Sequence, residues 1–286
     1  MKRVVVIGAK GMLGQELARI FGTAGYEVRG LDRDRIDFAD RGQLTKLLDE
    51  FKPNLFINAS AYNAVDKIEE SEAEFERAMA INARAVGQAA ALLQERGIPL
   101  VHYSSDYVFA GDSAAGYGED APLRPINKYG ETKLAGETEL KNNTDAYFLI
   151  RLSKLFGPSA ASEGAKKSFV DTMLWLAREG GKTKLDIVDE EVSAPTYAPD
   201  LARFTLELVS AALPYGIYHG ANSGTATWYE WAKKIFSLAG ISIELNPVSG
   251  DAFPRPARRP MFSELKNTKR PPQRSWEEAL EEYLSR

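Results

Sequence analysis

The chain has 286 residues, a formal net charge of −4 and no cysteine, and 44% of its residues are hydrophobic. This composition is typical of a globular protein with a hydrophobic core, and the lack of cysteine excludes disulfides, thiolate metal ligands and cysteine nucleophiles. The weak negative charge argues against binding to nucleic acid or anionic membranes. The N-terminal apolar run Val4–Ile7 is too short for a secretory signal, and no segment approaches the roughly 20 apolar residues that cross a bilayer, so we expect a cytoplasmic protein without membrane contact.

Short apolar runs alternate with segments of helical period along the chain. We predict strands over residues 3–7, 27–31, 55–59, 100–103, 147–152 and 184–188. We predict helices over residues 12–23, 42–51, 73–96, 128–141, 169–178 and 201–211, with a further helix beginning near Thr227. Near-continuous apolar strands in alternation with helices predict an α/β fold, a Rossmann-type doubly wound parallel sheet covered on both faces.

The pattern becomes irregular after Phe156. The segment Pro254–Pro260 carries three prolines in seven residues and is predicted to be an extended loop. We therefore predict an NAD(P)-binding Rossmann domain over residues 1–155 and a smaller C-terminal substrate-binding region over residues 156–286, with the chain crossing between them.

A glycine-rich turn follows the first predicted strand. Gly8, Gly11 and Gly14 form a GxxGxxG pattern that opens an amphipathic helix. Glycines at this place permit a tight turn, so that free amides at the start of the helix face a pyrophosphate. Because the pattern lies between a strand and a helix, it favours dinucleotide binding over an ordinary turn.

The second predicted strand is followed by Asp32 and Arg33. An acidic residue at this distance from the glycines can bind the ribose hydroxyls of NADH, whereas an arginine suits the 2′-phosphate of NADPH. The two residues favour different cofactors, so the choice between NADPH and NADH stays open.

Tyr129 and Lys133 form a YxxxK pattern on a predicted helix, which places both side chains on one face. A neighbouring lysine cation favours the phenolate and so makes a tyrosine more useful in acid–base catalysis at neutral pH. Ser105 follows a predicted strand at its carboxyl end, where ligands bind in open parallel sheets. Together these three residues predict a catalytic site.

The glycine pattern, Ser105 and YxxxK together resemble an extended short-chain dehydrogenase/reductase, and longer segments resemble the dTDP-4-dehydrorhamnose reductases in particular. The segments that carry this resemblance are residues 58–67, 102–109, 129–137, 194–202 and 259–265. The resemblance covers nearly the whole chain and implies reduction, by NADPH or NADH, of the C4 keto group of a nucleotide-linked deoxysugar. The expected reaction is conversion of dTDP-4-dehydro-L-rhamnose to dTDP-L-rhamnose, a precursor of cell-surface polysaccharide, by a monomer or homodimer.

The resemblance also implies a role for each matching residue. Tyr129 donates a proton to the sugar oxygen, Lys133 holds the nicotinamide ribose and lowers the pKa of Tyr129, and Ser105 polarises the carbonyl. The remaining cofactor-binding positions implied are Gly8, Gly11, Met12, Leu13, Gly14, Asp32, Arg33, Asp37, Phe38, Ala61, Tyr62, Asn63 and Tyr103, and the substrate-binding positions are Ser105, Asp106, Lys154 and Arg259. Of these, Asp37 and Phe38 match a segment that flanks the adenine in this family.

Two segments depart from the family pattern, and both lie in the substrate half. Lys154 stands where the family commonly has a tryptophan against the sugar, and 189–193 stands where it usually has a glutamine and a glycine. These changes affect the identity of the sugar more than the type of reaction. Arg259 lies in the rigid, basic proline-rich loop, and we expect it to contact the substrate diphosphate, because guanidinium groups match phosphate oxygens.

Three other functions occur on related folds and are alternatives to reduction. Sugar 4,6-dehydration needs an Asp-Glu pair after the catalytic hydroxyl, but Asp106 is followed by Tyr107. Epimerisation and a catalytically silent NADP-binding regulatory subunit stay open, although a regulator would be free to lose the triad.

Some reductases of this family dimerise through a magnesium ion held by glutamates. Glu16 and Glu190 lie in comparable regions of this sequence. We expect surface glutamates there and predict no metal.

Overall fold

A six-stranded parallel sheet forms the centre of the molecule. The computed structural model describes residues 1–162 and 167–286. The strand order is β2-β1-β3-β4-β5-β9, and every neighbouring pair runs parallel. The strands are β1 (Arg3–Ile7), β2 (Glu27–Leu31), β3 (Leu55–Asn58), β4 (Leu100–Ser105), β5 (Tyr147–Leu152) and β9 (Gly216–His219). The strand order reverses between β1 and β3, and ligands of open parallel sheets bind at the carboxyl ends beside such a reversal.

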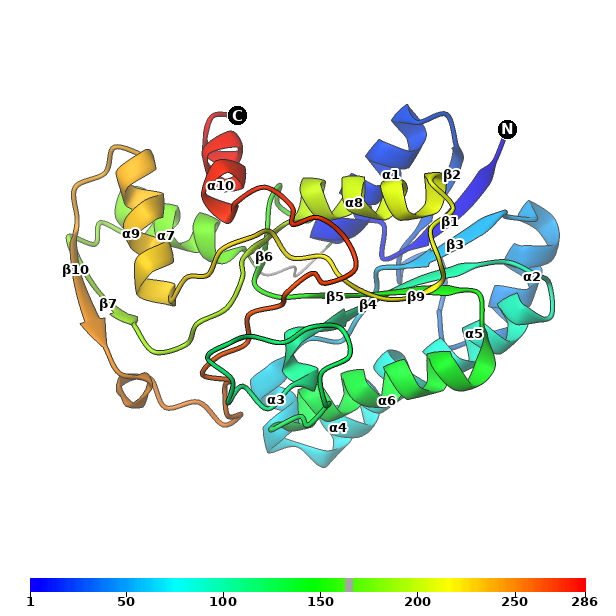
Figure 1. Ribbon diagram of the computed structural model, residues 1–286, viewed down its shortest axis with the longest axis horizontal. Coiled ribbons are helices and arrows are strands. Elements are labelled where there is room, and N and C mark those ends of the chain that lie inside the picture. The colour runs from blue at the N-terminus through cyan, green and yellow to red at the C-terminus, as the bar shows by residue number, and fades with distance from the viewer. Residues whose placement is uncertain (163–166) are drawn as a thin grey trace.

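Helices cover both faces of this sheet, as Figure 1 shows. The helices on one face are α1 (Met12–Thr23) and α8 (Ala198–Ser210), and those on the other are α2 (Arg41–Phe51), α5 (Ala85–Gln94) and α6 (Lys128–Asn143). Strand side chains alternate between the two faces: Val4 and Val6 pack toward α1, whereas Val5 and Ile7 pack toward α2 and α5. The predicted doubly wound Rossmann-type sheet is confirmed.

The single helix predicted over residues 73–96 is wrong in detail. The chain forms α3 (Val65–Glu70), α4 (Glu72–Met79), a five-residue π-helical turn η1 (Ala80–Arg84) and then α5. The Ser71 hydroxyl accepts a hydrogen bond from the amide of Glu74 and so starts α4 as a new helix. π-Helical turns inside helices are frequent at functional sites, and this one holds part of the site below.

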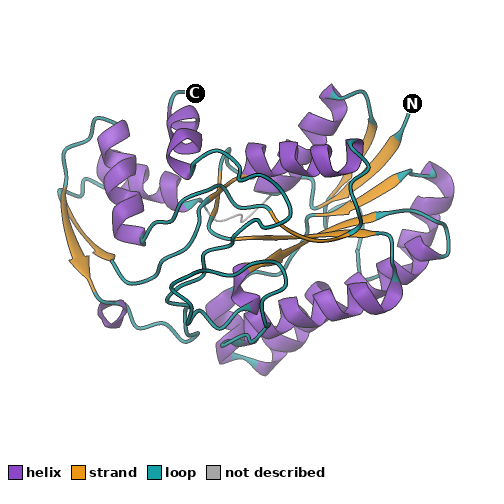
Figure 2. Ribbon diagram, in the orientation of Figure 1, coloured by secondary structure: helices purple, strands orange, loops and turns teal. Residues whose placement is uncertain are grey.

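A smaller layer lies beside the sheet. It comprises α7 (Phe169–Arg178), α9 (Trp228–Leu238), α10 (Trp276–Leu284) and the paired strands β7 (Lys184–Val188) and β10 (Glu244–Val248), with β6 (Leu155–Phe156) paired to β8 (Thr196–Tyr197) and the short helical turn η3 (Gly250–Ala252). Trp231 is 1% exposed at the centre of its separate hydrophobic core. Another short helical turn, η2 (Asp106–Val108), follows β4 of the central sheet. Figure 2 shows long loops between this layer and the sheet, and the proline-rich segment 254–260 is one of them, as expected.

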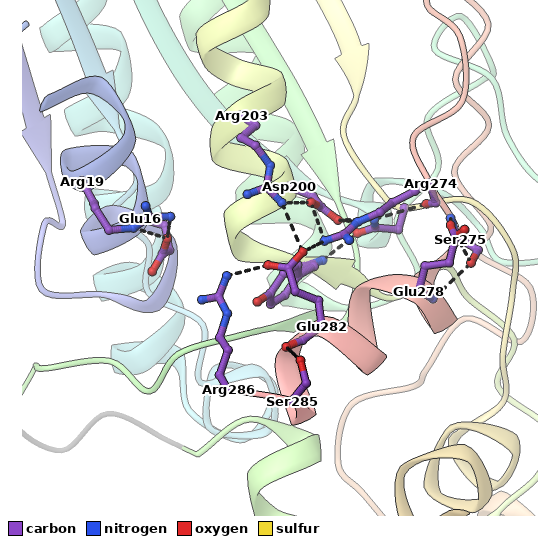
Figure 3. A network of polar contacts seen from close by, with 12 residues as sticks. Glu16, Arg19, Asp200, Arg203, Arg274, Ser275, Glu278, Glu282, Ser285 and Arg286 are labelled. Carbon is purple, nitrogen blue, oxygen red and sulfur yellow. Dashed lines mark hydrogen bonds and ion pairs between the residues drawn. The ribbon is translucent and has the colours of Figure 1, made fainter. Parts of the chain in front are cut away.

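The last helix is fixed to α8 by a network of ion pairs (Figure 3). Arg274 donates to both carboxylate oxygens of Asp200, at 2.8 and 3.0 Å, and also pairs with Glu282 of α10 at 2.5 Å. Arg286 pairs with the same glutamate at 2.6 Å. The C-terminal segment is therefore bound to a helix that covers the central sheet.

The sheet draws on both halves of the chain. Strand β9 pairs with β5, and α8 packs on the same face as α1, although both follow the predicted boundary near residue 155. The division into residues 1–155 and 156–286 stays a prediction. In the part of the chain that the structure describes, no helix is long and apolar enough to cross a membrane.

Candidate active site

The glycine-rich turn is built for close approach of a ligand. Gly8 has φ +79°, and a Cβ there would lie 2.9 Å from the main chain at Ala59. A Cβ on Gly14 would lie only 1.9 Å from the carbonyl oxygen of Gly8. Across residues 1–162 and 167–286, no side chain caps the start of α1 at Gly11, so the amides of the first turn are available to an anion. This cradle fits a dinucleotide pyrophosphate.

Asp32 lies beside this turn, at the end of β2. Its carboxylate accepts hydrogen bonds from the main-chain amides of Lys10 at 3.1 Å and Arg33 at 2.8 Å. Lys10 also forms an ion pair with Asp34 at 2.6 Å. The main chain of Lys10 and Arg33 is thus held at Asp32, and the ammonium of Lys10 pairs with Asp34, at the place where a ribose would bind.

The two residues expected to flank adenine lie in different surroundings. Asp37 is exposed and accepts a hydrogen bond from the amide of Ala39 at 2.9 Å. Phe38 is 8% exposed, and its ring stacks on Phe56 with centroids 6.4 Å apart. Phe38 therefore belongs to the core, and its role at the adenine stays a prediction.

The segment containing Ala61, Tyr62 and Asn63 is held by a residue that sequence reasoning missed. Asn82, in the π-helical turn, accepts from the amide of Tyr62 at 2.8 Å and donates to its carbonyl at 2.9 Å. The same amide donates to Thr132 of α6 at 3.0 Å. Asn82 is 1% exposed, so it fixes this loop to the helix that carries Tyr129.

The side chain of Tyr103 points into the core on the α8 side. Its hydroxyl lies 2.7 Å from the hydroxyl of Thr205, and the residue is 6% exposed. Its main-chain oxygen instead accepts a hydrogen bond of 2.7 Å from Lys133 Nζ. The backbone of Tyr103, rather than its ring, contacts the catalytic group.

The start of α6 brings Tyr129 to the end of β4. Asn127 caps the helix by accepting from the amide of Gly130 at 2.8 Å. A Cβ on Gly130 would lie 2.2 Å from the carbonyl oxygen of Tyr107, so only glycine permits this packing of α6 on η2. Tyr129 consequently hydrogen-bonds Ser105, and its ring packs edge-on against Tyr107 at 5.6 Å.

Ser105, Tyr129 and Lys133 lie together at the carboxyl end of β4, beside the reversal of strand order. Lys133 is 2% exposed, and burial lowers its pKa to about 8 although Glu137 opposes the change. Burial and the charge of Asp106 raise the pKa of Tyr129, while its hydrogen bond with Ser105 lowers it. This direction is opposite to the one expected from Lys133, whose ammonium is directed at the carbonyl of Tyr103. A raised pKa keeps the phenol protonated, as a proton donor must be.

Asp106 is buried between two hydroxyl groups. Ser105 donates to one carboxylate oxygen at 2.9 Å, and Ser263 donates to the other at 2.7 Å. Burial raises the pKa of Asp106 to about 6, although both hydroxyls and Lys154 act to lower it. Sequence reasoning noted Ser263 without giving it a role.

Lys154 connects the sheet to the smaller layer. It follows β5 with φ +40°, which is rare for a non-glycine residue. Its ammonium donates to the carbonyls of Glu191 at 2.9 Å and Ala226 at 3.3 Å and lies 4.1 Å from the ring centroid of Trp228. Burial lowers the pKa of Lys154 to about 7. Its expected contact with substrate stays a prediction.

Arg259 reaches the site from the proline-rich loop. Both carboxylate oxygens of Asp66 accept from its Nη2, at 2.9 and 2.8 Å. Asn127 donates to the neighbouring carbonyl of Arg258 at 2.8 Å, which ties this loop to the start of α6. Asp66 and Asn127 were not among the predicted site residues, because an acid on a helix and a helix cap are common features without a ligand.

Surface glutamates were expected at Glu16 and Glu190, and this is wrong for Glu16, which is only 5% exposed because α1 carries it against neighbouring elements, whereas Glu190 is exposed. Glu16 forms an ion pair with Arg19 at 2.6 Å, and Glu190 accepts from the amide of Gly250 at 2.8 Å. Among residues 1–162 and 167–286, no group of three or more histidine, cysteine, aspartate or glutamate residues could hold a metal ion.

A dinucleotide cradle beside a serine, a tyrosine and a lysine at the carboxyl end of a strand in a doubly wound sheet defines a short-chain dehydrogenase/reductase. A family model described as the RmlD substrate binding domain matches residues 1–286. The chain is 36% identical to the dTDP-4-dehydrorhamnose reductase of Escherichia coli over 93% of this chain and 90% of that protein. It is 35% identical to the spore coat polysaccharide biosynthesis protein SpsK of Bacillus subtilis, over 99% and 97%. The chain belongs to the dTDP-4-dehydrorhamnose reductase family.

A solved structure agrees with this assignment. The dTDP-4-dehydrorhamnose reductase of Bacillus anthracis in complex with NADP has a TM-score of 0.92 and 34% identity, covering 100% of this chain and 99% of that one. The fold and the family expected from the sequence are therefore both confirmed.

Proposed function

We propose that this protein reduces the C4 keto group of dTDP-4-dehydro-L-rhamnose to give dTDP-L-rhamnose, with NADPH as reductant. The observation that carries the proposal is the gathering of Ser105, Tyr129 and Lys133 at the carboxyl end of β4. Membership of a family whose relatives carry the name dTDP-4-dehydrorhamnose reductase supports the choice of substrate. The complex of the Bacillus anthracis relative with NADP supports NADPH, as do the basic residues Lys10 in the glycine-rich turn and Arg33 directly after Asp32.

When bound, NADPH would provide the hydride for the sugar carbon, and the residues of this chain would handle the proton and the charge. Tyr129, kept protonated by its raised pKa, gives its proton to the oxygen of the carbonyl as negative charge develops there. Ser105 hydrogen-bonds the same oxygen and stabilises that charge. Lys133, held at the main chain of Tyr103, would bind the nicotinamide ribose, and the amides after Gly11 would hold the pyrophosphate. Arg259 offers its guanidinium to the substrate diphosphate.

The test is addition of dTDP-4-dehydro-6-deoxy-L-mannose to enzyme and NADPH, with oxidation of NADPH followed by its absorbance and the sugar product identified by NMR. Loss of absorbance with formation of the L-rhamnosyl product is expected. Interconversion of sugars without net consumption of NADPH would indicate an epimerase instead. Cofactor binding without turnover of several 4-keto sugars would indicate a regulatory subunit.

Location and assembly are also part of the proposal. The absence of cysteine fits a reducing compartment, and both proposed substrates are small anionic molecules of metabolism, so we place the enzyme in the cytoplasm. We propose a monomer or a homodimer, which light scattering of the purified protein distinguishes.

A further inference from the structure

A chain of buried hydrogen bonds leads to the catalytic phenol. It runs from Ser263 through Asp106 and Ser105 to Tyr129. Ser263, Asp106 and Ser105 are 3%, 4% and 9% exposed, so water does not compete freely for these groups. The mechanism above uses Tyr129 and Ser105 but leaves Asp106 without a role.

The direction of these hydrogen bonds limits what Ser105 can do. A serine hydroxyl has one proton to donate, and here that proton goes to Asp106 Oδ1 at 2.9 Å. The amide of Tyr107 donates to the same hydroxyl oxygen at 3.2 Å. While Asp106 is a carboxylate it can only accept, so it holds the proton that Ser105 needs for the substrate carbonyl.

We infer that Asp106 is a positioning residue that works in its protonated form and turns Ser105 toward the substrate. A protonated Asp106 donates from Oδ1 to Ser105, and the serine proton is then free to point at the carbonyl oxygen. Ser263 still donates to Oδ2, which fixes the proton on the oxygen that faces Ser105. This inference rests on the proposed reductase function.

The surroundings of Asp106 favour such a proton. Burial is the largest influence on its pKa, which rises to about 6, and Lys154 is the cation that opposes the rise. Burial weakens that opposition because it lowers the pKa of Lys154 to about 7, while Glu191 and Glu230 act to keep Lys154 charged. On the other side, Asp106 raises the pKa of both Tyr107 and Tyr129, and Arg259 lowers that of Tyr107.

The decisive variant is Asp106→Asn, because an amide nitrogen at Oδ1 donates to Ser105 while the amide oxygen accepts from Ser263, as in the protonated acid. For the wild-type enzyme, kcat is expected to fall by about tenfold per pH unit above the pKa of Asp106. The variant is expected to turn over with no such decrease near pH 6, while the decrease due to Lys133 near pH 8 remains in both. Loss of more than about tenfold in kcat at every pH, with NADPH binding and Tm unchanged, would show that the carboxylate is required and overturn the inference.

Two further variants protect the test against misfolding of Asp106→Asn. Ser263→Ala removes a hydrogen bond that lowers the pKa of Asp106, so the decrease in kcat should move to higher pH; a decrease that stays in place contradicts the inference. The control is Asp49→Asn, which changes an exposed aspartate of α2 that pairs with Arg96. It is expected to leave the dependence of kcat on pH unchanged.

A measurement without turnover separates this inference from the proposed function. The carboxyl carbon of Asp106, identified by its absence from the ¹³C NMR spectrum of Asp106→Asn, should titrate near pH 6. If wild-type protein consumes no NADPH, the function fails, yet the titration still tests Asp106. A titration in the ordinary range of about 4 overturns the inference even if the enzyme is active.

Discussion

The Nζ atom of Lys133 donates a 2.7 Å hydrogen bond to the main-chain oxygen of Tyr103. This contact fixes a buried ammonium to the strand that ends at Ser105, one turn of α6 beyond Tyr129. Because Lys133 loses its charge more easily than an exposed lysine, activity should depend on pH through this residue.

Burial lowers the pKa of Lys133 to about 8, and this decides in which direction activity changes with pH. The ammonium is present below this pKa and is lost as pH rises through it, so NADPH affinity and kcat/KM should both fall above about pH 8. Lys133→Ala should weaken both at every pH. If the affinity for NADPH stays constant between pH 7 and 10, the lysine does not hold the ribose.

Tyr129→Phe tests the proton donor. The variant keeps the ring that packs on Tyr107 and removes only the hydroxyl, so it should lower kcat by about 10²–10⁴ with little change in the dissociation constant for NADPH. Stopped-flow measurement of NADPH oxidation gives the first value and fluorescence titration the second. Retained turnover would exclude Tyr129 from this role.

Gly14→Ala tests the cradle. The added Cβ would lie 1.9 Å from the carbonyl oxygen of Gly8, so the turn must move, and we expect a loss of about 1–3 kcal/mol in the free energy of unfolding together with weak NADPH binding. Gly22→Ala is the matched control in the same helix, because its Cβ would meet only a side-chain atom of Val28 at 3.9 Å. Urea denaturation should show a gain of up to about 1 kcal/mol for the control.

Arg259→Ala tests recognition of the diphosphate. Loss of a hydrogen-bonded charge should raise the KM for the nucleotide-sugar by about tenfold or more while the affinity for NADPH holds. Asp66→Asn removes the partner at 2.8 Å but keeps the guanidinium, so its KM should not rise. Steady-state kinetics with unchanged KM in Arg259→Ala would remove the arginine from the substrate site.

Substitution of Arg151 tests how much its buried ion pair with Glu137 contributes to the stability of the fold. Arg151 donates to both oxygens of Glu137, at 2.9 and 2.8 Å, and the two side chains are 0% and 1% exposed. Arg151→Met leaves a buried carboxylate without its partner, so we expect a loss of about 3–5 kcal/mol in the free energy of unfolding. Arg84→Met, which breaks an exposed pair with Glu76, should cost less than about 1 kcal/mol. Similar losses for the two variants would contradict this difference.

The sequence predicted most strands of the central sheet. Residues 3–7, 27–31 and 147–152 were predicted with the bounds that β1, β2 and β5 have. Strand β9 was missed because Gly216–His219 is only four residues long and, beginning with glycine and ending with histidine, carries little apolar signal. The π-helical turn was missed because its residues continue the helical period of their neighbours.

Some residues of the candidate site could likewise be predicted from the sequence, and others could not. The glycines, Ser105 and YxxxK could be found because their chemistry requires particular residues at fixed spacings. Asn82, Asp66 and Ser263 act through partners 20, 193 and 157 positions away, and such pairings follow from the folded chain. The direction of the change in the pKa of Tyr129 likewise depended on the burial of its surroundings.

The pairing of β9 with β5 has a consequence for biosynthesis. When the ribosome has completed residues 1–155, every element of the proposed dinucleotide site has been made, but the outer edge of β5 still lacks its neighbour. That edge remains open to other nascent chains until about 60 further residues, ending in Gly216–His219, have been translated.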